Sequence, residues 1–341
     1  MAQINKPNEY FNTVLYTGNN STQSITGVNF QPDLVYVKGR NTATRYPTMF
    51  DSVRGATKRL TTHSTNAEDT HPTMLTSFDS DGWTTGADDQ TNGSSETYVS
   101  WNWLAGGTAV SNTDGDMTSS VSANTTSGFS IATYTGDGVN GSTFGHGLGV
   151  APKVVIIKCR SLGTEDWHFW YNNSTRLNLN NANIGSAISP ISTSSTLVTT
   201  PSSTNDSWNG SGQTYVSYCF AEKKGLSKFG TYTGTGTTDA PFIYTGFKPA
   251  YIVIKSSTYG GNWLCFDNKR DSYNENSGNP LNINEANPEG ADPAYQIDFL
   301  SNGFKLRNAN GNINNPGETM VYMCFAETPL VGTNNTPTTA R

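Results

Sequence analysis

The chain has 341 residues, of which only 14% are charged, against about 25% in typical soluble proteins. Its net charge of −6 argues against a nucleic-acid partner, because phosphate binding needs clustered Lys and Arg. No 18-residue apolar run is present and the first six residues lead into no apolar stretch, so we expect neither membrane insertion nor a secretory signal. Aromatic residues make up 11%, too many for a disordered chain. Abundant Thr, Tyr and Gly with short apolar runs predict an all-β protein.

The same pattern of three sequence elements occurs three times along the chain. A Tyr-Thr-Gly sequence comes first, then a proline that opens an apolar run ending in lysine, and last a strand that closes the unit. In chain order these elements occupy 16–18, 32–38 and 97–103, then 134–136, 152–158 and 214–220, and then 232–234, 249–255 and 319–325. Three copies of a scaffold favour a display surface or an assembly over a single catalytic site.

The repeat predicts three tandem antiparallel β-sandwich modules of jelly-roll or lectin-like type. Units of roughly 100 residues are expected to be domains with their own cores. The predicted boundaries are 1–107 for module 1 with a short N-terminal arm, 108–127 for a polar linker or hairpin, 128–225 for module 2, 226–329 for module 3 and 330–341 for a polar tail.

The proline-opened runs predict strands that are covered on both faces, because four successive positions are apolar. In the closing strands one face carries large residues, such as Trp101 and Trp103, and we expect that face to fill the core between the two sheets of each module. Asp-Gly at 81–82 and Asn-Gly at 302–303 predict hairpins. Module 2 lacks such a pair and is predicted to lack that hairpin.

The four histidines give no metal or catalytic pattern. His146 lies in a glycine-rich loop, and the other two units have no histidine there, so we interpret it as a loop residue. His168 lies in a predicted strand without partners at metal-ligand spacing. His63 and His71 are eight residues apart in a polar loop, a weak metal pair.

Carboxylates and serines do not form a catalytic set either. Asp51 and Asp267 are the candidate pair for glycoside hydrolysis, but they hold matching places in two units and would lie in separate domains. The acidic clusters at 79–81 and 114–116 could hold calcium, although hairpin turns explain them better. No nucleophile-elbow sequence is present. We therefore expect no catalytic, cofactor or metal site and a protein that is not an enzyme.

Other residues are interpreted as structural. The basic stretch from Arg54 to Arg59 is expected to be a solvated loop. The chain has four cysteines, and each is expected to be a small, buried, apolar side chain: Cys159, Cys219, Cys265 and Cys324.

The loops that differ among the units are the candidate binding elements, although their ligand-binding residues stay unknown. They comprise residues 42–47, 161–166 and 256–262. Thr-, Asn- and aromatic-rich loops on a rigid sandwich suit sugar binding, and variable loops equally suit contacts to different neighbours in an assembly.

Several motifs resemble repeats in virion proteins of marine tailed phages, which carry lectin-like (concanavalin-like) sandwich modules and are often labelled tail fibre. The matching stretches are 50–58, 128–136, 145–153, 244–249 and 325–327. The resemblance implies a bacteriophage virion component and defines no functional residues.

Three functional hypotheses follow. The leading one is a tail-associated structural protein, a fibre tip or adhesin, that contacts the host surface through lectin-like modules. The alternative is a capsid decoration or head-fibre protein that binds the capsid shell, and the third is an enzyme that degrades surface polysaccharide. Expected partners are other virion proteins and host surface glycans, with a homo-oligomer in the virion, assembled in the host cytoplasm.

Overall fold

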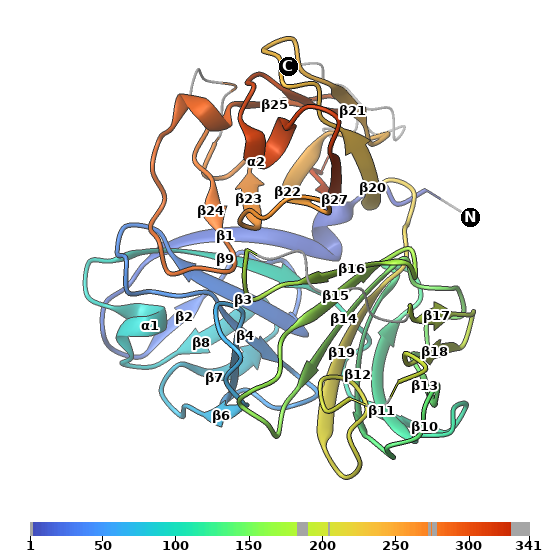
Figure 1. Cartoon of the computed structure of the whole chain (residues 1–341). Coiled ribbons are helices and arrows are strands. Elements are labelled where there is room, and N and C mark those ends of the chain that lie inside the picture. The colour runs from blue at the N-terminus through green and yellow to red at the C-terminus, as the bar shows by residue number, and fades with distance from the viewer. Residues whose placement is uncertain (1–2, 183–189, 204, 272–273, 275–277, 329–341) are drawn as a thin grey trace.

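The computed structural model describes residues 3–182, 190–203, 205–271, 274 and 278–328. The predicted tail at 330–341 lies outside these residues. Within the described residues, the strands pair antiparallel into six sheets, which confirms the all-β class. Each sequence repeat contributes one large sheet and one three-stranded sheet, and Figure 1 shows the three groups arranged around a common centre. We call these parts of the chain repeat 1 (11–103), repeat 2 (110–220) and repeat 3 (227–326).

Repeat 1 follows a short 3-10 helix, η1 (Pro7–Glu9), and contains one helical turn, α1 (Asp89–Asn92). Its large sheet has the order β1-β9-β3-β4-β5-β6 and its small sheet the order β2-β8-β7. The strands are β1 (Phe11–Thr17), β2 (Gln23–Ile25), β3 (Leu34–Gly39), β4 (Thr48–Asp51), β5 (Lys58–Thr61), β6 (Asp69–Thr70), β7 (Leu75–Asp79), β8 (Gly82–Thr85) and β9 (Thr97–Trp103).

Repeat 2 has the large sheet β10-β11-β12-β19-β14-β15-β16 and the small sheet β13-β18-β17. Two of its strands, β10 and β11, come from the predicted linker and form a hairpin that extends the large sheet. The strands are β10 (Val110–Asn112), β11 (Ser119–Asn124), β12 (Phe129–Thr135), β13 (Thr143–Gly145), β14 (Val154–Cys159), β15 (His168–Tyr171), β16 (Thr175–Asn178), β17 (Ser192–Thr193), β18 (Leu197–Thr199) and β19 (Thr214–Phe220).

Repeat 3 has the large sheet β20-β27-β22-β23-β24 and the small sheet β21-β26-β25, with the short helices η2 (Pro293–Tyr295) and α2 (Gly311–Asn314). The strands are β20 (Ser227–Thr233), β21 (Phe242–Tyr244), β22 (Pro249–Ser256), β23 (Leu264–Asp267), β24 (Leu281–Asn282), β25 (Ile297–Leu300), β26 (Gly303–Leu306) and β27 (Thr319–Ala326).

The recurring Tyr-Thr-Gly sequence lies at the end of the strand that pairs with the closing strand, which is β1, β12 or β20, and joins it to the segment that precedes the closing strand. The tyrosine hydroxyl donates to a backbone carbonyl there, at 2.6 Å from Tyr16 to Thr91, 2.8 Å from Tyr134 to Trp208 and 2.5 Å from Tyr232 to Ile313. A Cβ on the glycine that follows would lie within 2.1–2.3 Å of a backbone oxygen of the same segment. Only glycine permits this close approach.

Each pair of sheets encloses its own apolar cluster. In repeat 1 the cluster combines Val35 and Tyr98 of the large sheet with Ile25 and Trp83 of the small one. Equivalent clusters fill repeats 2 and 3. The predicted hairpins at 81–82 and 302–303 are confirmed as β7–β8 and β25–β26.

The prediction that repeat 2 lacks this hairpin is wrong. Strands β17 and β18 pair antiparallel at the equivalent place. Their connection uses Ser194 in place of an Asp/Asn-Gly pair, because the Ser194 hydroxyl accepts from the backbone N–H groups of Thr196 and Leu197 at 3.2 and 2.9 Å.

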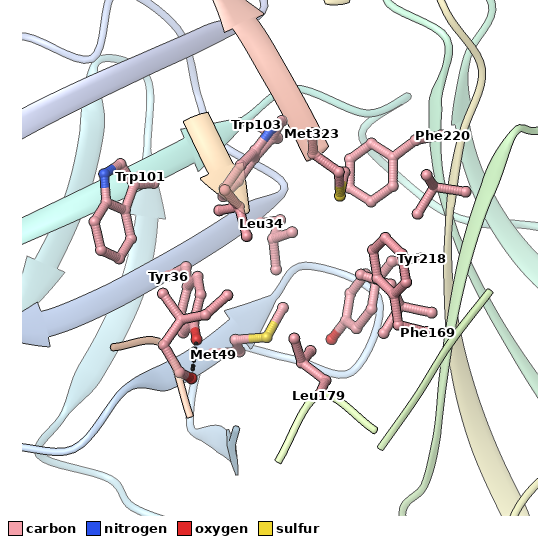
Figure 2. Packing of buried hydrophobic residues seen from close by; sticks show 14 of the residues in the cluster. Leu34, Tyr36, Met49, Trp101, Trp103, Phe169, Leu179, Tyr218, Phe220 and Met323 are labelled. Carbon is pink, nitrogen blue, oxygen red and sulfur yellow. Dashed lines mark hydrogen bonds between the residues drawn. The ribbon is translucent and has the colours of Figure 1, made fainter. Parts of the chain in front are cut away.

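A fourth apolar cluster lies between the three large sheets and contains residues from every repeat. Figure 2 shows Leu34, Trp101 and Trp103 of repeat 1 facing Tyr218 and Phe220 of repeat 2 and Met323 of repeat 3. The equivalent residues Trp103, Phe220 and Phe325 approach one another, with ring centroids 5.7 Å apart for Trp103–Phe325 and 6.0 Å for Phe220–Phe325. We call this the central cluster.

The central cluster corrects the prediction for the closing strands. Their large-residue face, with Val99, Trp101 and Trp103 in repeat 1, packs against the other repeats. The opposite face, which carries Tyr98, covers the small sheet. The large sheet is thus buried on both sides, which agrees with the fully buried pattern of β3, β14 and β22. The division into three independent domains stays a prediction.

Candidate functional site

Three equivalent loops follow the central strands β3, β14 and β22. They are the variable loops of the sequence, 42–47, 161–166 and 256–262, and we call them the strand-end loops. Residues near their tips are exposed, such as Thr44, Thr164 and Tyr259, whereas each loop runs into a buried residue at 47, 167 or 263. The loops therefore have exposed tips and immobilised bases.

A buried lysine holds the base of each strand-end loop. Lys38, Lys158 and Lys255, which end the recurring apolar runs, have no exposed surface. Each Nζ donates to a backbone carbonyl of its own loop, and the acceptors are Arg45 at 3.2 Å, Glu165 at 2.8 Å and Gly261 at 2.6 Å. The lysine recurs because it satisfies a buried carbonyl at the same place in each repeat.

Two of these lysines also bind the neighbouring repeat. Lys158 of repeat 2 donates to the carbonyl of Thr65 in repeat 1 at 2.8 Å, and Lys255 of repeat 3 donates to that of Ala182 at 2.8 Å. Burial lowers the pKa of Lys158 and of Lys255 to about 8. Burial, with the positive charge of Arg270, lowers the pKa of Lys38 to about 7.

Arginines at two of the loop bases form ion pairs across repeat boundaries. Arg160 of repeat 2 contacts Glu68 of repeat 1 with Nε 2.8 Å from Oε2. Arg40 of repeat 1 contacts Glu289 of repeat 3 through two hydrogen bonds of 3.0 and 2.6 Å. In both pairs the glutamate N–H also donates to the arginine carbonyl, at 2.8 and 2.7 Å. Repeat 2 thus contacts repeat 1 in the way that repeat 1 contacts repeat 3.

The carboxylate of Asp51 is the centre of a buried network at the first of these boundaries. Asp51 Oδ2 lies 2.5 Å from Nε of Arg54, and neither side chain has exposed surface. Arg54 also contacts Glu68 at 3.0 Å, and the hydroxyl of Tyr218 in repeat 2 donates to Asp51 at 2.7 Å. Burial acts to lower the pKa of Arg54, but the charges of Asp51 and Glu68 outweigh it and hold that pKa above its ordinary value. The expectation that residues 54–59 form a solvated loop is therefore wrong for Arg54.

Asp267 is the centre of the matching network at the boundary of repeats 3 and 1. Its Oδ2 lies 2.7 Å from Nε of Arg270, again without exposed surface on either side chain. Arg270 lies 3.4 Å from Glu289, and Trp101 of repeat 1 donates its indole N–H to Asp267 at 3.1 Å. Trp101 and Tyr218 hold equivalent places in β9 and β19. The two carboxylates considered for glycoside hydrolysis are thus buried, ion-paired and in different sheets.

Among the described residues, the third boundary, between repeats 3 and 2, lacks the aspartate, the arginine and the hydrogen-bonding aromatic residue of this network. Register places Tyr171, Ser174 and Met323 where the other boundaries have aspartate, arginine and a hydrogen-bonding aromatic residue. Here Trp263 of repeat 3 donates its indole N–H to the carbonyl of Asn178 in repeat 2 at 2.8 Å, next to the Lys255 contact. All three residue types are replaced together at this boundary. This is expected if each side chain stabilises the boundary only when its partners in the network are present.

The histidines are held apart by separate contacts. His146 is buried, and its ring bonds the backbone of Ser194 and of Leu148, each at 3.2 Å. His168 is buried beside Arg176, and burial lowers its pKa to about 3. His63 stacks on Tyr46, and His71 lies 3.0 Å from Asp69.

The acidic clusters bind backbone and hydroxyl groups of turns. Asp81 accepts from the N–H groups of Gly27 and Asn29 at 3.1 and 2.6 Å, and Asp116 accepts from the hydroxyl of Thr143 at 2.7 Å. Across the described residues, no three His, Cys, Asp or Glu side chains are grouped as metal ligands. The four cysteines are free and buried, as predicted.

The network residues that sequence reasoning missed are Glu68, Glu289 and the arginines and aromatic residues that contact them. One signal was present, because Asp51-x-x-Arg54 and Asp267-x-x-Arg270 recur at matching places.

A family model described as a domain of unknown function, DUF7483, matches residues 6–329. The chain belongs to this family.

The DUF7483 match covers all three repeats as one unit. No curated protein and no solved structure matches the chain. No helix in the described part of this DUF7483 chain is long and apolar enough to cross a membrane.

Proposed function

We propose that this DUF7483 chain is a structural protein of a tailed-phage virion, attached to the tail, that contacts the host surface through its strand-end loops. The observation that carries the proposal is the equivalent anchoring of these loops. In each repeat a buried lysine holds the loop base, while the tip is exposed. Such loops suit recognition because little conformational entropy remains to be lost at their bases on binding.

The division of labour between repeated and variable residues supports the same function. The polar residues that recur form the contacts between repeats. The Asp51–Arg54 and Asp267–Arg270 pairs, for example, each accept a hydrogen bond from the neighbouring repeat. The loop tips differ, with Tyr259 of repeat 3 exposed at 54% and a glycine and a threonine at the tip of the repeat 2 loop. A constant scaffold with variable tips is typical of surfaces that bind other molecules. The proposed partners are other virion proteins and host surface glycans, with a homo-oligomer in the particle.

A second candidate is a capsid decoration or head-fibre protein. The cyclic contacts favour it, since repeat 2 contacts repeat 1, repeat 1 contacts repeat 3 and repeat 3 contacts repeat 2. Three similar surfaces around one centre suit a partner site of threefold symmetry, which shells and trimeric tail parts both offer.

Immunogold labelling of intact particles tests both candidates. Antibodies raised against the full chain should label the tail, whereas labelling of the capsid alone would replace the tail role by the decoration role. Particles without label would reject both. Incubating the chain with host polysaccharide should release no reducing ends, and their release would favour the depolymerase hypothesis.

A further inference from the structure

A polar pocket of about 230 Å³ lies between repeats 1 and 3, away from the strand-end loops. One wall comes from β1 and the residues before it, with Asn8, Phe11 and Thr13. The other comes from repeat 3, with Ala250 and Asn268. The residue types on the two walls explain why this boundary is open.

Each wall carries a residue that is smaller than its counterparts in the other two repeats. Thr13 pairs with Trp101 on β9, and the residues at the same register are Ile131 in repeat 2 and Phe229 in repeat 3. Ile131 and Phe229 both belong to the central cluster. Thr13 is therefore smaller than its counterparts in the other repeats and leaves space at this boundary.

Ala250 is the small residue on the opposite wall. It follows the proline of the apolar run, where repeat 1 has Asp33 and repeat 2 has Lys153. Asp33 is buried and binds the backbone N–H groups of Ala105 and Gly107, whereas Lys153 pairs with Glu222. In repeat 3 the methyl group of Ala250 takes the place of these longer side chains, which leaves the pocket open.

Three polar side chains around the pocket are uncommitted, whereas Asn12, Glu327 and Thr328 are hydrogen-bonded or ion-paired. Thr13 is 4% exposed, and its hydroxyl has no hydrogen-bond partner, although a buried hydroxyl ordinarily has one. Within the described part of the chain, the side-chain amides of Asn8 and Asn268 also make no hydrogen bond.

We infer that this pocket binds one sugar unit of a glycan. The side-chain amides of Asn8 and Asn268 both donate and accept, as sugar hydroxyls do, and this pairing is the pattern by which polar groups orient a ligand in a pocket. Ala250, which is partly exposed, adds apolar surface suited to the C–H face of a sugar ring. The inference rests on the proposed contact with host glycans and adds to the strand-end loops a second glycan-binding place, at the boundary of repeats 1 and 3.

The test measures sugar binding by the full chain and two pocket variants. The probes are an array of neutral and uronic-acid oligosaccharides, followed by titration with the best binder. Thr13→Ile fills the pocket with the residue that repeat 2 uses, and Asn268→Ala removes an amide. Each should weaken binding by about tenfold or more. Thr231→Ile makes the same change on an exposed position of β20 and should bind like the wild type.

Binding that Thr13→Ile leaves unchanged, or no binding of any sugar by the wild type, would overturn the inference. Circular dichroism of each variant shows whether a loss of binding reflects a loss of folding, and Asn268→Ala provides the second reading if Thr13→Ile misfolds. Particle labelling is independent of these results. Labelled particles with an inert pocket would reject the pocket alone, and sugar binding without labelled particles would reject the virion role alone.

Discussion

The hydroxyl of Tyr218 donates a hydrogen bond of 2.7 Å to Oδ2 of Asp51, across the boundary between repeats 2 and 1. Both side chains have no exposed surface, and Asp51 is at the same time ion-paired with Arg54. Burial and the neighbouring Asp51 raise the pKa of Tyr218 well above its ordinary value, so the hydroxyl remains the donor. The contact thus joins two repeats through a buried charge that needs all its partners.

Tyr218→Phe should destabilise the whole chain. The change removes one hydrogen bond to a buried carboxylate and leaves the ring in the central cluster, so we expect a loss of about 1.5–3 kcal/mol in the free energy of unfolding. Guanidinium denaturation followed by tryptophan fluorescence measures it. Tyr259→Phe, at a tyrosine that is 54% exposed, is the matched control and should change stability by less than about 0.5 kcal/mol. Equal effects of the two variants would show that the contact across the boundary contributes nothing.

Asp51→Asn should cost more than Tyr218→Phe. The guanidinium of Arg54 would remain buried with only Glu68 to balance it, and breaking a buried pair typically costs about 3–5 kcal/mol. The same denaturation measurement gives the value. The double variant Asp51→Asn/Tyr218→Phe should lose clearly less free energy of unfolding than the sum of the two single losses, because both changes act on one network. Strict additivity would contradict the network.

The fold class, the central strands, the hairpins of repeats 1 and 3 and the buried cysteines could be predicted, because each depends on local patterns. Four successive apolar residues from Leu34 to Val37 also indicated that both faces of β3 are covered. The identity of the second covering layer could not be predicted. Trp101 and Trp103 are the largest residues of their strand, and size alone cannot distinguish packing against the small sheet from packing against another repeat.

The boundary contacts were hidden for a related reason. Asp51 and Arg54 are three residues apart, but Glu68 and Tyr218, which complete their network, are separated from Asp51 by 17 and 167 residues. Such pairings depend on how the repeats are placed around the central cluster. The pocket next to Thr13 has the same origin, since its two walls come from opposite ends of the chain.

Stability should fall as the pH drops below about 6.5, before most carboxylates titrate. Burial lowers the pKa of His168 to about 3, with the charges of Arg176 and Lys158 acting the same way, and burial also lowers those of His63 and His146. Below pH 6.5 the unfolded chain therefore binds protons that the folded chain does not. His168 alone should contribute a loss of about 1.4 kcal/mol per pH unit down to about pH 3.

His168→Leu tests this assignment, because Leu264 is the equivalent residue of repeat 3. Unfolding free energies measured at pH 8.0, 6.5, 5.5 and 5.0 should decline less steeply for the variant, by about 1.4 kcal/mol per unit. Parallel curves for the variant and the wild type would contradict a buried neutral His168.

The thiols should be inaccessible in the folded chain. All four cysteines are free and buried, and burial raises the pKa of Cys219 to about 12. Because the thiolate is the reactive form, a disulfide-exchange reagent at pH 8 should label none of them in the native protein and all four in guanidinium. Rapid labelling of any thiol without denaturant would show that its strand opens locally.

The central cluster, in which Trp103, Phe220 and Phe325 meet, leads us to expect that the three repeats unfold as one cooperative body and not as the three independent domains predicted from the sequence. Differential scanning calorimetry of the full chain tests it most directly. One body predicts a single heat-absorption peak whose calorimetric and van't Hoff enthalpies agree. The Phe220→Ala variant should move that whole peak to lower temperature. Two or three separate transitions, with only one of them moved by Phe220→Ala, would contradict the claim.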